Sequence, residues 1–181
     1  MLHEYIFFSR GGQGGVTATR ILATAAVAEE RYAQAIPEFG AERRGAIVRS
    51  YLRISDEPIK RHSRVEIAEG VAVFSSRIAE LVNLQEFMKP GGFALINTSK
   101  PRALPGIRTF TVDATGIAVG LGLVIAGWPV VNTAMTGAFA RIVGLKLDSV
   151  LKAMEDFFHG KLLEANQEAA RRAYEDVREV S

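Results

Sequence analysis

The segment YIFFSRGGQGGVTATRILATAA (residues 5–26) contains three stretches of distinct composition. Residues 5–9 are mostly apolar and aromatic, a composition that predicts a short buried strand. Residues 10–15 contain four glycines, and each glycine loses more backbone freedom on folding than any other residue would. Residues 16–31 are rich in alanine and end in charged side chains, which predicts a helix. The segment therefore predicts a strand, a glycine loop and a helix in succession.

A helix that follows a glycine loop presents unpaired N–H groups and the positive end of its dipole, and both favour a bound anion. A Walker loop would end in Gly-Lys-Ser/Thr, but here Val16 and Thr17 follow the glycines. The dinucleotide fingerprint aligns only in part, with Thr17 in place of its third small residue and Glu38 near the expected ribose-binding acid. Two interpretations stay open: an anion or cofactor site, or a tight turn that lets the helix pack closely on a sheet.

Downstream of this segment, apolar runs alternate with helical patterns, which predicts an α/β fold. Further strands are expected at residues 32–36, 46–54, 71–75, 93–97 and 107–112. The alternation in residues 46–54 predicts a half-buried strand, residues 78–88 are expected to form a helix, and residues beyond Asp113 are expected to be helical to the end of the chain. We expect one domain, residues 1–181, with a Rossmann-like sandwich, a mainly parallel sheet and a helical C-terminal part.

The composition excludes several classes of function. The chain has 181 residues, and its 22 Lys and Arg nearly balance its 20 Asp and Glu, so the charge does not indicate a nucleic-acid partner. It has no cysteine, so it cannot supply thiolate ligands to an iron–sulfur cluster. Its three histidines, His3, His62 and His159, are isolated in the sequence. We therefore expect neither a catalytic residue nor a metal site in this chain.

Residues 114–140 form a long stretch with no charged side chain. The stretch is long enough for a transmembrane helix, but glycines interrupt it and GWPVVN (residues 127–132) predicts a break between two shorter helices. Its large apolar residues include Trp128, Val130, Val131, Met135 and Phe139. We expect helices that are buried or face another subunit, with self-association of the isolated chain and no membrane contact. The first residues lack the pattern of a secretory signal, so a cytoplasmic location is expected.

Several motifs resemble one known family along nearly the whole chain. They are RGGQGGVTATRILATAA, YAQAIPEFGAERRGAIVRSYLRISDEPI, VDATGIAVGLG, NTAMTGAFARIVG and NQEAARRAYE. In this order they resemble the gamma subunit of 2-oxoacid:ferredoxin oxidoreductases, the pyruvate synthase or pyruvate:ferredoxin oxidoreductase family. The combination of the glycine loop with FGAERRG (residues 39–45) is specific, and the form of that second motif favours pyruvate or a branched-chain 2-oxoacid over 2-oxoglutarate.

The resemblance implies a division of labour among subunits. In this family thiamine diphosphate lies between the alpha and beta subunits, and 4Fe-4S clusters lie in the beta and delta subunits; Mg²⁺ is likewise expected only in partner subunits. The complex converts a 2-oxoacid, coenzyme A and oxidised ferredoxin to an acyl-CoA, carbon dioxide and reduced ferredoxin. The gamma subunit has an α/β fold and is thought to help hold coenzyme A and to brace the assembly. The isolated chain is therefore expected to be inactive.

Candidate ligands for coenzyme A follow from its phosphates. The glycine loop suits the diphosphate, Thr17 can donate its hydroxyl, and arginines can form charge-assisted contacts. The candidate residues are Arg10, Gly11, Gly12, Gln13, Gly14, Gly15, Thr17, Arg43 and Arg44. Arg43 and Arg44 could instead pair with Glu38 and Glu42, or with acids of a partner subunit. Two other functions also stay open: a purely structural assembly subunit without cofactor contact, and a nicotinamide-binding Rossmann oxidoreductase.

Overall fold

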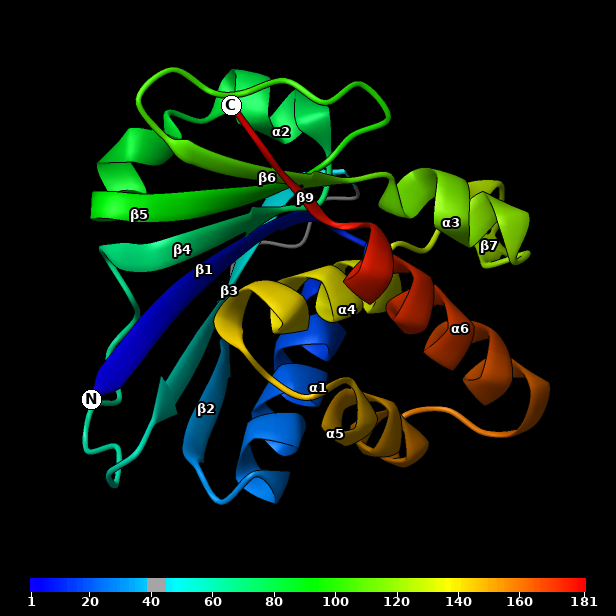
Figure 1. The fold of residues 1–181 in the computed structure, drawn as a ribbon, viewed down its shortest axis with the longest axis horizontal. Helices are drawn as coiled ribbons and strands as arrows, with labels where there is room; N and C mark the ends of the chain where they lie inside the picture. The colour runs from blue at the N-terminus through cyan, green and yellow to red at the C-terminus, as the bar shows by residue number, and fades with distance from the viewer. Residues whose placement is uncertain (39–44) are drawn as a thin grey trace.

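The computed structural model describes residues 1–38 and 45–181, and its centre is a seven-stranded sheet (Figure 1). The strand order is β2-β3-β1-β4-β5-β6-β9. The strands are β1 (Leu2–Arg10), β2 (Tyr32–Pro37), β3 (Ile47–Ser55), β4 (Ala68–Val73), β5 (Met88–Asn97), β6 (Arg108–Val112) and β9 (Arg178–Val180). A separate two-stranded hairpin consists of β7 (Val124–Ile125) and β8 (Trp128–Pro129).

The sheet is mixed and mainly parallel, as the sequence predicts. β1, β4, β5 and β6 are parallel neighbours. β3 runs antiparallel to both β1 and β2, so β2 points the same way as β1. Of the seven sheet strands in the described part of the chain, only β3 and β9 run in the opposite direction. The predicted α/β sandwich with a Rossmann-like arrangement is therefore confirmed.

Helices cover the two faces of the sheet unequally (Figure 1). The helical elements are α1 (Gly15–Ala28), α2 (Ser76–Leu81), η1 (Leu84–Phe87), α3 (Ala114–Gly120), α4 (Asn132–Val143), α5 (Leu147–Ala153), η2 (Met154–Asp156) and α6 (Gly160–Asp176). One face packs against α1 and α3–α6, and the smaller cluster on the other face includes α2 and η1. Strand β1 has an unbroken run of apolar residues because both faces of the sheet are covered there and its side chains contribute to both clusters.

Large aromatic side chains form the centre of the thicker layer. Tyr5 and Phe7 from β1 contact Phe139 from α4, with ring centroids 5.1 and 4.7 Å apart. Met135 and Phe139 have no exposed surface, and Val131 is also buried. These three residues therefore belong to the core of the chain itself, and the expectation that they would add to a subunit contact is wrong.

Two local predictions differ from the structure. The second half of β3 is buried on both faces, because the Arg53 side chain is only 1% exposed and forms an ion pair with Glu4 on β1, with Nε and Oε1 2.8 Å apart. The helix predicted for residues 78–88 is divided into α2 and η1. In one continuous helix Ile78 and Leu84 would point in different directions, whereas an extended Val82 between the two elements lets both reach the same apolar cluster.

The last part of the chain is not entirely helical. Helices α3 and α4 are separate, as the GWPVVN motif predicts, but the hairpin β7–β8 fills the break. The final strand β9 pairs with β6 and covers a sheet edge whose backbone groups would otherwise lack partners. Within the described ranges, no helix combines the length and the apolar character needed to span a membrane.

Candidate functional site

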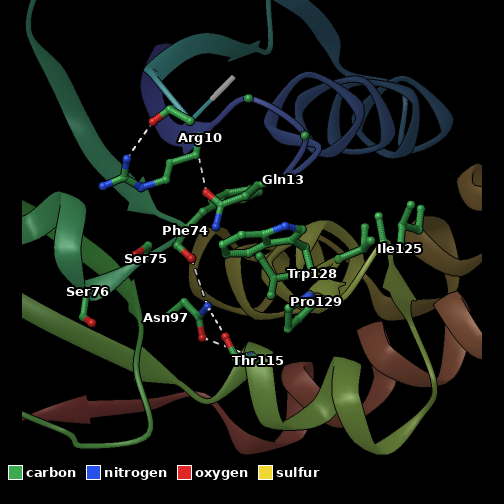
Figure 2. Close-up of a pocket in the computed structure, with 16 residues that line it drawn as sticks. Arg10, Gln13, Phe74, Ser75, Ser76, Asn97, Thr115, Ile125, Trp128 and Pro129 are labelled. Atoms are coloured by element: carbon green, nitrogen blue, oxygen red, sulfur yellow. Dashed lines mark hydrogen bonds between the residues drawn. The ribbon is translucent and has the colours of Figure 1, made fainter. Parts of the chain in front are cut away.

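A pocket of about 830 Å³ lies at the carboxyl ends of β1, β4 and β5 (Figure 2). Its wall includes Arg10 at the end of β1, Ser75 just after β4 and Asn97 at the end of β5. The chain leaves β1 into α1 on one face of the sheet and leaves β4 into α2 on the other face. The pocket therefore lies at the point where the connections change faces, which is where ligands bind in open α/β sheets.

The glycine loop forms one wall of this pocket through Gly11, Gly12 and Gln13. The Gln13 side-chain oxygen accepts a hydrogen bond from the Arg10 N–H at 2.7 Å, and the Gln13 N–H donates to the Arg10 carbonyl at 3.0 Å. Gly12 has φ of 92°, a conformation that side chains rarely adopt. Because the Gln13 side-chain oxygen already accepts a hydrogen bond from the Arg10 N–H, only the Gln13 NH₂ group is available to a ligand, as a donor.

Gly14 and Gly15 allow the start of α1 to pack closely against neighbouring residues of α4 and β1. A Cβ on Gly14 would lie 2.6 Å from Nδ2 of Asn132, and Gly14 also has φ of 80°. A Cβ on Gly15 would lie 2.5 Å from the Ser9 hydroxyl oxygen. Both positions therefore require glycine so that α1 can begin close to β1 and α4.

Helix amino ends surround the pocket. Its lining includes residues at or just before the first turns of α1, α2, α3 and α4, namely Gln13, Ser76, Thr115 and Val131. The side chains of Ser75 and Asp113 cap α2 and α3, but the N-cap residues of α1 and α4 form no side-chain cap. Unpaired N–H groups and the helix dipoles make this edge of the sheet favourable for negative charge.

The Arg10 guanidinium adds a full positive charge at the rim. One of its nitrogens donates to the Gly45 carbonyl at 2.6 Å, which leaves other donors of the planar group available. Among residues 1–38 and 45–181, no carboxylate forms an ion pair with Arg10. The wall of the pocket thus combines an arginine, a glycine loop and an uncapped helix.

Comparison with known proteins identifies the family. The family described as pyruvate ferredoxin/flavodoxin oxidoreductase matches residues 4–176. The chain belongs to this family.

Individual members of the family align over nearly the full length. The chain is 44% identical to the pyruvate synthase subunit PorC of Methanothermobacter marburgensis over 176 residues, covering 97% of each chain. It is 42% identical to the pyruvate/ketoisovalerate oxidoreductases common subunit gamma of Thermococcus kodakarensis, covering 94% of this chain and 95% of that one. The crystal structure of pyruvate oxidoreductase subunit PORC from Thermotoga maritima matches with a TM-score of 0.82 and 31% identity, covering 99% of each chain. The resemblance to gamma subunits seen in the sequence is therefore confirmed.

The structure divides the candidate residues of this oxidoreductase-family chain into three groups. Arg10, Gly11, Gly12 and Gln13 line the pocket together. Gly14, Gly15 and Thr17 do not line it, although they form the start of α1 just behind it. Arg43 and Arg44 lie outside the described residues, and Gly45, which follows them, lines the pocket.

The sequence analysis did not identify the residues of the opposite pocket wall, Phe74, Asn97 and Thr115. The Asn97 amide donates to the Phe74 carbonyl and to the Thr115 hydroxyl oxygen, each at 2.9 Å, and its oxygen accepts from the Thr115 N–H at 3.2 Å (Figure 2). These bonds connect the ends of β4 and β5 to α3. Polar residues at the ends of two predicted strands, Ser75 and Asn97, were the available signal, because parallel strands bring their carboxyl ends to one edge.

Proposed function

We propose that this chain, as the gamma subunit of a 2-oxoacid:ferredoxin oxidoreductase complex, binds coenzyme A in the pocket at the carboxyl ends of β1, β4 and β5. The complex would convert a 2-oxoacid, coenzyme A and oxidised ferredoxin to an acyl-CoA, carbon dioxide and reduced ferredoxin. Pyruvate is the favoured 2-oxoacid, since the relatives at 44% and 31% identity are named for pyruvate. The name of the Thermococcus relative, a gamma subunit common to two oxidoreductases, supports the view that other chains select the 2-oxoacid.

The observation that carries the proposal is the character of the pocket wall. Arg10, with no ion-pair partner among the described residues, lies beside the glycine loop and the uncapped start of α1. Such a wall favours phosphate, because guanidinium and backbone N–H groups form strong charge-assisted hydrogen bonds with it. Coenzyme A carries a diphosphate and a 3′-phosphate, so its nucleotide half matches this chemistry.

Each residue of the wall then has a distinct role. The Gly12 N–H borders the diphosphate, the Gln13 NH₂ group donates to a phosphate oxygen, and the Arg10 guanidinium balances charge. Arg43 and Arg44 are proposed as further phosphate ligands, and their short distance in sequence from Gly45, a lining residue, supports this role. The start of α1 behind the pocket is shaped by Gly14, Gly15 and Thr17, which do not contact the ligand directly.

The chemistry of the reaction is assigned to partner subunits. We expect thiamine diphosphate, Mg²⁺ and 4Fe-4S clusters in the alpha, beta and delta chains, since this chain has no cysteine to ligate a cluster. The chain contributes by binding coenzyme A, bracing the complex and leaving the reactive thiol free to reach the other subunits. Ferredoxin would be a partner only through the assembled complex.

A purely structural role is the second candidate, because exposed apolar side chains lie next to the pocket. Val119, Val124, Ile125 and Trp128 are all at least 41% exposed, and such a surface marks interaction sites. The family match makes the nicotinamide-binding hypothesis the weakest of the three sequence-based hypotheses.

The test compares arginine variants in the purified complex. Arg10→Ala should raise the KM for coenzyme A about ten- to a hundredfold, the effect of losing one hydrogen bond to a charged group. Arg10→Lys should restore part of the affinity, and the effect should shrink at high salt. Arg20→Ala is the matched control, because Arg20 is exposed on α1 away from the pocket lining. An unchanged KM for coenzyme A, with lower activity at every concentration and a looser complex, would favour the structural role.

Arg43→Ala and Arg44→Ala extend the test to the residues outside the described part of the chain. A thermal shift of the isolated chain provides a second measurement, because a ligand that binds only the folded state raises its stability. Coenzyme A should raise the melting temperature, whereas NAD should not.

A further inference from the structure

The hairpin β7–β8 has a constrained geometry at the pocket rim. Ile125 pairs with Trp128 across a turn of two residues, Ala126 and Gly127, whose φ angles are 50° and 82°. Positive φ at both central residues is the geometry of the tightest hairpin turns, and at an alanine it carries a cost in strain. The Val130 N–H donates to the Leu123 carbonyl at 2.8 Å and closes the base of the hairpin. The hairpin therefore sets the backbone position of Trp128 at the pocket rim.

Trp128 is the only tryptophan of the chain, and it is 74% exposed. It lines the same pocket as Arg10 and Gln13, and Figure 2 shows its indole ring extending toward the Gln13 side chain. Other large apolar residues of this region, such as Met135 and Phe139, are completely buried. The hairpin thus presents an uncovered aromatic ring beside a wall that favours anions.

This pairing of features selects a particular ligand chemistry. A phosphate group satisfies the arginine and the glycine loop, and a planar heteroaromatic ring next to it would cover the indole face. Coenzyme A has both features close together in its 3′-phospho-ADP half, whereas the pantetheine half has no ring. Stacking of a base on an aromatic side chain contributes substantially to nucleotide binding and tolerates variation in the base.

We infer that Trp128 is the stacking platform for the adenine ring of coenzyme A, so that this chain recognises the nucleotide half and leaves the pantetheine thiol for the partner subunits. This inference rests on the proposed function, because it requires coenzyme A in the pocket. Trp128 would contribute affinity for the heteroaromatic ring, separately from the phosphate contacts of Arg10.

The test uses the two halves of the ligand as separate probes. Adenosine 3′,5′-bisphosphate and pantetheine are titrated into the full-length chain, and binding is measured by calorimetry and by tryptophan fluorescence, which reports on Trp128 alone. The bisphosphate should quench the fluorescence, whereas pantetheine should not. Trp128→Leu should weaken binding of the bisphosphate about five- to a hundredfold, and Trp128→Phe should weaken it less because a ring is retained.

The same variants in the assembled complex separate the possible outcomes. Trp128→Leu should raise the KM for coenzyme A without changing that for the 2-oxoacid. Val119→Ala is the control, since Val119 is 54% exposed nearby but does not line the pocket. If Arg10→Ala weakens coenzyme A binding but Trp128→Leu does not, the stacking role is wrong and the proposed function stands. If Trp128→Leu releases the partner subunits at unchanged affinity for coenzyme A, the hairpin is a subunit contact. If the wild-type protein, alone and in the complex, binds neither probe nor coenzyme A, both proposals fail.

Discussion

Replacing Gly137 by alanine should destabilise the protein, because this residue sets the distance between α4 and α6. A Cβ built at Gly137 would lie 2.1 Å from the carbonyl oxygen of Ala170 on α6 and 2.7 Å from its carbonyl carbon. These atoms belong to the backbone of a helix, so no side-chain rotation can relieve the overlap. Ordinary contact begins at 3.4 Å, so the helices would have to separate by roughly 1.3 Å at this point.

The magnitude follows from two opposing effects. Forcing a tightly packed core apart costs up to about 3 kcal/mol. Alanine in a helix interior recovers about 1 kcal/mol relative to glycine. We therefore expect a net loss of about 2 kcal/mol in the free energy of unfolding, and a melting temperature lower by about 4–8 °C for a chain of this size.

The assay is urea denaturation followed by circular dichroism, with calorimetric melting as a second measurement. Gly120→Ala is the matched control, because Gly120 ends α3, has no atom within 4 Å of its built Cβ and lies outside the left-handed region. It should leave the stability unchanged or raise it slightly. Ala170→Gly should not rescue Gly137→Ala, because the overlap is with backbone atoms. A Gly137→Ala protein as stable as the wild type would refute the reasoning about this helix contact.

Two further predictions concern buried ionisable groups. Burial, with the Glu69 carboxylate as the second cause, raises the pKa of Tyr5 to about 12. Because the raised pKa belongs to the folded state, the stability is unaffected below pH ~10, and about 3 kcal/mol of the free energy of unfolding is lost as the pH rises through the folded-state value. Tyr5→Phe should reduce this alkaline loss of stability, measured by urea titrations at several pH values, whereas the control Tyr32→Phe at an exposed position should not. If the wild type and both variants lose stability identically at alkaline pH, Tyr5 is not the group responsible. Glu4→Ala should cost about 3–5 kcal/mol, because it leaves the buried Arg53 guanidinium without its partner; a loss below about 1 kcal/mol would show that this pair is solvated.

Local sequence determined the parts of this protein that depend on neighbouring residues. The apolar run before the glycine loop and the alanine-rich run after it specified β1 and α1, because strand and helix periodicities are local signals. The alternation of such segments specified the α/β class, and the motif GWPVVN specified the break between α3 and α4. The candidate residues Arg10, Gly11, Gly12 and Gln13 were also found this way, since a loop between strand and helix lies at a sheet edge.

Only the tertiary structure decided which distant residues complete the pocket and the core. Asn97 and Thr115 meet Phe74 because β4 and β5 are parallel neighbours, and this strand order has no local sequence signal. The sequence predicts an exposed position for Arg53 on a half-buried strand, whereas in the structure Arg53 is buried and forms an ion pair with Glu4. Trp128 and Phe139 were both expected to contribute to a subunit contact, yet Phe139 is buried in the core and the hairpin turn leaves Trp128 exposed at the rim of the pocket. For Asn97, Thr115 and Arg53 the deciding contacts join segments far apart in the chain, and their energy depends on packing that composition and periodicity do not encode.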